Sequence, residues 1–270
     1  MNRLATLFAS LALAAGNAAP SLAASFEVAV LPSRFELETK SAARVGRSVD
    51  IYNVGSTATE VSVRTLDWSY SEDGRITYHD ALQPDSCRPL VTLERKTLKV
   101  APRSKAAFRI QVDVPADAPR GECRLMLAVE GIEPAYQATI AQGGMNLSLP
   151  VSGRIAVAIY VAINGAEPKL SVGQVAMKTL NGRPTPVVTV TNAGDAHGRL
   201  EGSLDAVDAK GVAFELIPEG TPVLPGQTRT LPLLPKGEAS AAPKALSFPV
   251  KASGSLDWDK GSFKINAQLR

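Results

Sequence analysis

Short segments in which apolar and polar residues alternate recur along most of the chain, as in residues 49–52, 61–64, 108–112 and 187–190. These segments are rich in β-branched residues and bounded by Gly, Pro, Asn or Asp, which is typical of half-buried strands. No longer stretch shows an apolar stripe at helical spacing, although 36–44 and 136–142 are expected to allow a turn or two of helix. Strands spaced about ten residues apart predict an all-β fold built from antiparallel sandwiches.

Two similar segments predict the number of domains. Residues 49–55 and 188–194 each run as a strand into Asn-x-Gly, and each half of the chain continues to a turn that contains Pro, at Pro102 and at Pro225. Two copies of one sandwich explain this better than one large sheet. The junction is expected at residues 164–168, where turn residues interrupt the pattern.

We therefore expect an N-terminal domain over residues 24–163 and a C-terminal domain over residues 164–270. Both are predicted to be immunoglobulin-like β-sandwiches. The Asn-x-Gly pairs are interpreted as turns, because Asn and Gly tolerate a positive φ.

The first residues have the pattern of a secretory signal peptide. Arg3 precedes an apolar run over residues 4–15, and a small-x-small pattern ends at Ala23. The run is shorter than the roughly 20 residues that a membrane helix needs. Residues 1–23 are thus predicted to be removed near Ala23, leaving an exported chain that does not span a membrane.

The two cysteines, Cys87 and Cys123, are expected to pair in an oxidising compartment. On the chain-entropy model, closing a loop of this length stabilises a fold by roughly 3–4 kcal/mol. A redox-active thiol is the weaker alternative, because the sequence has no CxxC motif and neither His is near a Cys in sequence.

Charge and motif content exclude several function classes. The chain carries 29 Lys+Arg and 26 Asp+Glu, a net charge of +3 that is too mild to predict nucleic-acid binding. Two His and two Cys are too few for a typical structural zinc site, so no metal and no cofactor are expected. His79 and His197 lie near no nucleophile motif, and residues 71–74 resemble a hairpin turn, so the chain is not expected to be an enzyme. Trp68 and Trp258 are interpreted as packing residues.

One predicted strand is unusually long. Its apolar residues share one parity and are interrupted only by Gly153; they are Met145, Leu147, Leu149, Val151, Ile155, Val157 and Ile159. At about 3.3 Å per residue this strand would extend roughly 50 Å, so residues 145–151 are expected to project past the sheet, after a long connection over 131–144. Pro150 fits an edge position. Two alternatives remain open: the strand is buried in its own sandwich, or it pairs with another polypeptide by strand addition.

These features together resemble the periplasmic chaperones of pilus assembly. The resemblance is carried by an exported pair of immunoglobulin-like domains, an Arg early in the first strand at residues 30–37, and the long alternating strand before the linker. It implies that Arg34 lies in the cleft between the domains and binds the C-terminal carboxylate of a pilus subunit. It also implies that Leu147, Leu149 and Val151, with Met145 on the same face, insert into the incomplete fold of that subunit.

The chain departs from the family at one position. Where the family has a Lys on the long strand, this sequence has Ala156, and Arg154 two residues earlier is expected to supply the second cation. The implied partner is a pilus or fimbrial subunit in the periplasm; whether an outer-membrane usher takes part is left open. The alternative function is a secreted immunoglobulin-like structural or adhesive module that binds through its loops.

Overall fold

The computed structural model describes residues 26–71, 74–132, 136–142, 145–151, 153–180, 182–237 and 247–270, with only the backbone described in 136–142 and 145–151. Strands dominate this part of the chain, and its one helical element is the 3-10 helix η1 (Arg88–Leu90). The all-β prediction is confirmed. None of the described helical segments could cross a bilayer. The turns of helix expected at 36–44 and 136–142 are wrong, because residues 36–39 and 136–142 are strand and residues 41–42 form a turn between two strands.

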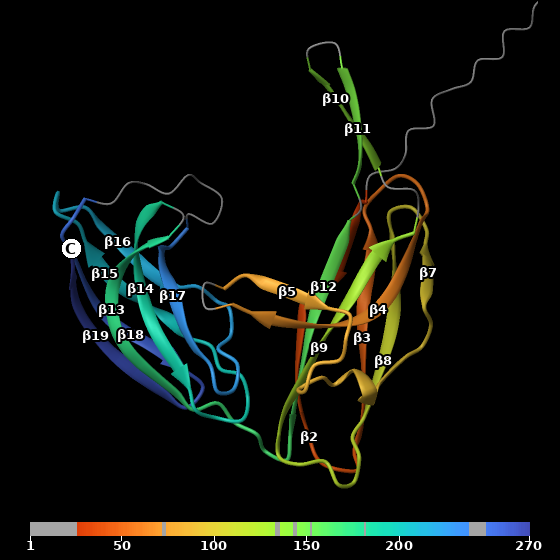
Figure 1. The fold of residues 1–270 in the computed structure, drawn as a ribbon, viewed down its shortest axis with the longest axis horizontal. Helices are drawn as coiled ribbons and strands as arrows, with labels where there is room; N and C mark the ends of the chain where they lie inside the picture. Colours follow the sequence, from red (N-terminus) through yellow and green to blue (C-terminus); the bar gives the residue numbers. More distant parts are fainter. Residues whose placement is uncertain are drawn as a thin grey trace, which may run out of the picture.

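The first domain is a sandwich of two sheets (Figure 1). The four-stranded sheet has the order β1 (Val28–Leu31), β3 (Arg44–Asn53), β8 (Ser104–Asp113), β6 (Val91–Leu93). The six-stranded sheet has the order β2 (Arg34–Thr39), β12 (Arg154–Ile163), β9 (Gly121–Gly131), β4 (Thr59–Tyr70), β5 (Ile76–His79), with β7 (Thr97–Val100) beside β4. A hairpin of β10 (Tyr136–Gln142) and β11 (Met145–Val151) forms a sheet of its own.

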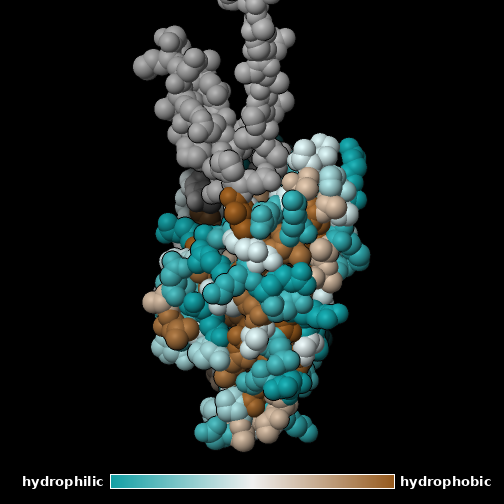
Figure 2. Space-filling model, turned by 90° about the vertical axis from the view of Figure 1, so that its right-hand side faces the viewer, coloured by the Kyte–Doolittle hydropathy of each residue, from teal (hydrophilic) through white to brown (hydrophobic). Residues whose placement is uncertain are grey.

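The core of this domain follows the alternation in the sequence. On β8, Phe108 and Ile110 are buried between the sheets, whereas Lys105 and Arg109 are exposed. Figure 2 shows the side of the molecule with β7 and β8, where hydrophilic residues prevail and apolar ones are scattered. The period of two thus predicts which face of each strand is buried.

Both faces of β12 are covered for most of its length. Val157 and Ile159 belong to the sandwich core, whereas Tyr160 on the other face packs with Trp68 and with Leu224 of the second domain. Sequence alternation alone does not reveal this second apolar face, because a strand buried on both sides has mixed parity.

The second domain is one seven-stranded sheet wrapped around its own core. The order is β13 (Leu170–Leu180), β14 (Arg183–Asn192), β17 (Thr228–Pro235), β16 (Ala213–Pro218), β15 (Glu201–Val207), β18 (Val250–Trp258), β19 (Gly261–Leu269). The strands at the two ends of this order, β13 and β19, contact each other. Their closure encloses a core that includes Val188, Leu204 and Leu231.

The first group of sheets ends with β12 at Ile163, and the second begins with β13 at Leu170; the exact domain boundary stays a prediction. Asn164 and Gly165 have φ of 57° and 74° there. The Asn164 side chain is held by the first domain: Nδ2 donates to the carbonyl of Ala118 at 2.9 Å, and Oδ1 accepts from the backbone N–H of Ser41 at 2.9 Å.

Asn53, in the first Asn-x-Gly pair, is a buried hydrogen-bond hub. Its Oδ1 accepts from the N–H of Gly55 at 3.0 Å, and its Nδ2 donates to the carbonyls of Thr57 at 2.7 Å and Val100 at 3.2 Å. Neither Asn53 nor Gly55 has a positive φ, so the sequence-based explanation of this pair is wrong.

The second pair repeats the same network. The Oδ1 of Asn192 accepts from the N–H of Gly194 at 2.9 Å, and its Nδ2 donates to the carbonyls of Ala196 at 2.8 Å and Val223 at 2.9 Å. In each domain the amide therefore ties the strand end to the turn that contains Pro. This shared network is the physical basis of the sequence repeat.

Three further expectations are met. Cys87 and Cys123 form a disulfide, which ties the start of η1 to β9. Trp68 is buried, and Trp258 stacks on Phe263 with ring centroids 6.4 Å apart, so both tryptophans pack. Gly74 donates to the carbonyl of Ser71 at 2.9 Å in the expected hairpin turn.

Candidate partner-binding site

The hairpin of β10 and β11 continues the pairing of β9 with β12 beyond the sandwich. Glu130 of β9 lies opposite Arg154 of β12, and farther along Tyr136 of β10 lies opposite Val151 of β11. Figure 1 shows that the hairpin extends past the end of both sheets. The segment 131–144, expected to be a connection, thus contains a strand.

The single long strand expected over 145–159 is two strands. β11 ends at Val151 and β12 begins at Arg154, and the two belong to different sheets. Met145, Leu147, Leu149 and Val151 occupy alternate positions of β11, opposite Gln142, Ile140, Ala138 and Tyr136 of β10. The expected projection of 145–151 is present, on a hairpin rather than on a lone strand.

Gly153 lies where the long strand is interrupted, and the reason is steric. A Cβ at this position would lie 2.0 Å from Cδ1 of Phe26. The same ring lies over Gly131, where a Cβ would meet Cδ2 at 3.0 Å. Phe26 therefore packs where a side chain at Gly153 would stand, next to the core cluster of the first domain.

One edge of this hairpin and of β12 is open. β2 runs parallel to β12 and pairs with it only from Ala158 to Ile163. Among the strands in the described part of the chain, none pairs with residues 154–157 on that side, and β10 alone pairs with β11. The open edge therefore runs along β11 and along residues 154–157 of β12, and it ends where β2 begins.

Arg34, the first predicted anchor, is the residue at which β2 begins. It lies opposite Ala158 of β12, at the end of the open edge. Its side chain is half exposed (51%), and its Nε lies 3.0 Å from Oε1 of Glu36. Arg34 is therefore an accessible cation at the end of the open edge, and its binding of a carboxylate stays a prediction.

Arg154, the predicted second cation, lies elsewhere and is already paired. It forms an ion pair with Glu130 and lies over the ring of Tyr78, 5.8 Å from its centroid. Glu130 also accepts from Nε and Nη2 of Arg64, both at 3.1 Å. Arg154 is four residues from Ala158 along β12, or about 13 Å, so the structure does not bring it together with Arg34.

Residue Ala156, where the family has Lys, lies between these two positions. It is opposite Ala128 of β9 and packs against the apolar cluster between the domains. The position therefore contributes packing and no charge.

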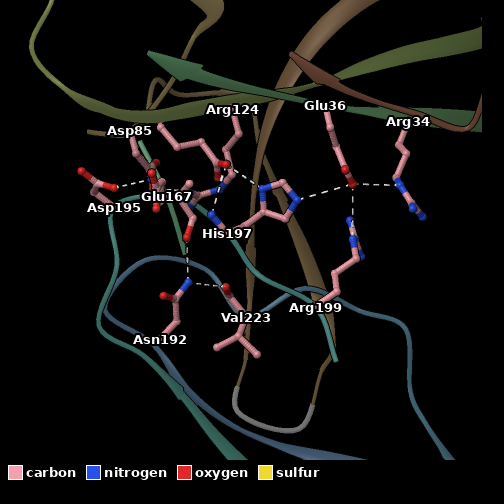
Figure 3. Close-up of polar contacts among 12 residues, drawn as sticks. Arg34, Glu36, Asp85, Arg124, Glu167, Asn192, Asp195, His197, Arg199 and Val223 are labelled. Atoms are coloured by element: carbon pink, nitrogen blue, oxygen red, sulfur yellow. Dashed lines mark hydrogen bonds and ion pairs between the residues drawn. The ribbon is translucent and has the colours of Figure 1, made fainter. Parts of the chain in front are cut away.

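The joint between the domains is built around His197, which sequence reasoning did not select (Figure 3). Its Nδ1 lies 2.6 Å from Oε2 of Glu122 on β9, and its Nε2 lies 3.5 Å from Oε1 of Glu36 on β2. The ring stacks on Tyr160, with centroids 3.9 Å apart. One residue of the second domain thereby contacts three strands of the first.

Two arginines and His197 converge on one carboxylate in this joint. Nε of Arg199 lies 3.4 Å from Oε1 of Glu36, the same oxygen that Arg34 and His197 approach (Figure 3). Burial raises the pKa of the Glu36 carboxyl, but the contacts with His197, Arg199 and Arg34 outweigh burial and hold that pKa below its ordinary value.

Two other groups near the site have shifted pKa values. Burial raises the pKa of the Tyr160 hydroxyl, so it stays protonated under Arg199. Hydrogen bonds from Arg64 lower the pKa of the Glu130 carboxyl against the effect of its burial, and Arg154 lowers it further. Glu130 is therefore an ionised carboxylate that pairs with both Arg64 and Arg154.

Further contacts complete the joint. Arg120 of the first domain pairs with Asp195, with Nε 2.5 Å from Oδ2. Tyr70, at the end of β4, lies under the guanidinium of Arg229, whose Cζ is 4.7 Å from the ring centroid. The two domains thus meet through packing, ring stacking and ion pairs.

Sequence reasoning missed these residues for a definable reason. His197, Arg199 and Glu122 carry no motif, and Glu36 and Glu122 are 86 positions apart, brought together only by the pairing of β2, β12 and β9. The one available signal was on β2, where the charged residues Arg34 and Glu36 occupy alternate positions and so share one face of the strand.

Comparison with known proteins gives structural likeness alone. No protein-family model and no curated protein match the sequence. Among solved structures, the chain is similar to the YadV chaperone at 13% identity, over 90% of this chain and 100% of that one, with a TM-score of 0.47. It is similar to the E. coli chaperone DraB at 17% identity, over 92% and 98%, with a TM-score of 0.45. A structure of the Salmonella enterica SafA pilin in complex with the SafB chaperone matches at 12% identity, over 90% and 97%, with a TM-score of 0.45.

Proposed function

We propose that the protein is a periplasmic chaperone that binds an exported pilus subunit by strand addition and anchors the subunit's C-terminal carboxylate at Arg34. The observation that carries this proposal is the open edge along β11 and residues 154–157, which ends at Arg34. An open edge offers a row of backbone N–H and C=O groups, which an added strand satisfies.

The geometry also gives the direction of the added strand. A polypeptide that ends at Arg34 and lies along the open edge runs from the tip of the hairpin toward Ala158, and so runs parallel to β11 and β12. It occupies the line that β2 continues, and β2 is itself parallel to β12. The added strand would thereby continue the parallel pairing of β2 with β12 along residues 154–157 and β11.

In this proposal β11 supplies both backbone and side chains. Backbone hydrogen bonds give affinity, and alternate residues of β11, namely Met145, Leu147, Leu149 and Val151, fill pockets in a subunit that lacks a strand. The partner is kept folded and soluble until assembly. Export after removal of residues 1–23 would bring the protein into the compartment of its subunit.

Replacement of Leu149 by Glu tests the proposal. The expected result is loss of a pilin-like subunit from affinity purification of periplasmic extract, with an unchanged circular dichroism spectrum of the free protein. The matched control is Leu234→Glu, which places the same charge at an exposed position of β17. Unchanged subunit binding by Leu149→Glu would overturn strand donation.

Hydrogen exchange separates this function from a secreted structural or adhesive module. In a hairpin, alternate amides of β11 bond to β10 and the others point to the open edge. The edge amides are expected to exchange rapidly in the free protein and slowly with bound subunit. Strong protection of all amides of Leu147, Ser148, Leu149 and Val151 in the free protein would favour the module.

A further inference from the structure

The carboxylate of Glu36 is surrounded by an excess of positive charge. Arg34 Nε lies 3.0 Å and Arg199 Nε 3.4 Å from its Oε1. Glu122, the other carboxylate of the joint, is hydrogen-bonded to His197 through both Nδ1 and the backbone N–H. Two permanently charged guanidinium groups therefore share one partly exposed carboxylate.

The two arginines differ in a way that suits ligand binding. Arg199 is fixed: its Nη1 donates to the carbonyl of Gly220 at 2.7 Å, and its guanidinium lies over the Tyr160 ring, 5.7 Å from the centroid. Its side chain is 15% exposed, against 51% for Arg34. One cation is thus held in place by the second domain, while the other is accessible on the first.

We propose that Arg34 and Arg199 together form a carboxylate-binding site between the two domains, in which Glu36 is an internal ligand that an incoming carboxylate must displace or share. This inference rests on the proposed function, in which the incoming group is the C-terminus of a subunit. The second cation is then Arg199 of the second domain and not Arg154, which is paired with Glu130.

The position of the site agrees with the route of an added strand. Arg34 and Glu36 are two residues apart on β2, and β2 begins at the end of the open edge. A chain that follows this edge reaches Arg34 first and Arg199 next to it. Guanidinium groups bind carboxylates through paired N–H donors, so two arginines can hold both oxygens of a chain terminus.

An internal carboxylate at this site has a consequence for affinity. A free carboxylate must compete with Glu36 for the two arginines, so it binds this site, but weakly. A subunit that also pairs with β11 gains backbone hydrogen bonds as well, and can displace Glu36. The site then favours chain termini presented by an added strand over free carboxylates.

An NMR titration tests the inference without a subunit. The probe is N-acetylglycine, with N-acetylglycinamide as the neutral control, added to the ¹⁵N-labelled chain without residues 1–23. The arginine Nε–Hε signals are assigned with Arg34→Lys and Arg199→Lys. Both signals are expected to shift together with one dissociation constant, and N-acetylglycinamide should shift neither.

Variants then test each part. Glu36→Gln should lower the dissociation constant roughly two- to fivefold, as expected from removal of an exposed ion pair. Arg199→Lys should weaken binding, whereas the control Arg44→Lys, an exposed arginine on β3, should not.

Three outcomes overturn the inference. The Nε–Hε signal of Arg34 shifts without that of Arg199, Glu36→Gln raises the dissociation constant of N-acetylglycine, or Arg154→Lys weakens binding as much as Arg199→Lys does. Failure of the proposed function is separate, because it is seen as unchanged subunit binding by Leu149→Glu. The titration can succeed when that experiment fails, and the reverse.

Discussion

Glu122 in the first domain accepts two hydrogen bonds from His197 in the second, from ring Nδ1 at 2.6 Å and from the backbone N–H at 3.1 Å. The Glu122 side chain is 1% exposed and that of His197 is 10% exposed. A carboxylate this deeply buried needs its partner, so this pair fixes how the second domain meets β9.

Replacement of His197 by Ala should therefore destabilise the protein strongly. Without His197 the buried Glu122 side chain loses both of its hydrogen-bond donors, and each buried polar group left unsatisfied typically costs about 1–3 kcal/mol. The free energy of unfolding in urea measures the effect. Adding Glu122→Leu to His197→Ala should recover part of the loss, since the buried carboxyl group without a partner is then removed; a double variant no more stable than the single one would contradict this explanation.

Local patterns explain how much of this fold was predictable. The alternation on β8 identifies its buried face, and the two cysteines, on the expectation that the chain is exported, predicted the disulfide. The repeat around Asn53 and Asn192 was correctly recognised as shared architecture. Its cause was not, because a side-chain bond from Asn53 to Val100 joins residues 47 apart and leaves no local pattern.

The binding site was predictable only in part. The chain segment 145–151 stands out by its alternation, and Arg34 by the family resemblance. The pairing of Arg154 with Glu130 depends on the register of β12 against β9, and the contact of Arg199 with Glu36 on the packing of two domains. Neither is encoded by spacing along the chain, so the sequence did not indicate that Arg199 lies beside Glu36.

Glu36 makes stability depend on pH at the acidic end. Because the pKa of its carboxyl is lowered in the folded protein, Glu36 contributes stability above the unfolded-state pKa of about 4.3, and this is lost as pH falls through the folded-state pKa. Urea unfolding between pH 7 and pH 3 should show a smaller loss of stability for Glu36→Gln than for the unmodified chain. Parallel pH profiles would contradict the contribution of this ion cluster.

The paired asparagines make a prediction for each domain. Asn53→Ala and Asn192→Ala each remove a buried amide and leave two carbonyls without their donor, of which at least one is buried in each domain, which should cost about 1–3 kcal/mol. Unfolding curves should show the loss in the domain that carries the substitution. Asn266→Ala, at an exposed position of β19, is the control and should change stability by no more than about 0.5 kcal/mol.

Phe26 should determine what is tolerated at Gly153. An added Cβ there lies 2.0 Å from Cδ1 of Phe26, so Gly153→Ala forces the ring out of its place and should cost about 1–3 kcal/mol. Phe26→Ala loses packing by itself but removes the clash, so the double variant should be more stable than the sum of the two single losses predicts. The control is Gly220→Ala, where an added Cβ meets nothing within 4 Å, and where little change is expected. Additive losses in the double variant would show that the contact between Phe26 and Gly153 does not restrict this position.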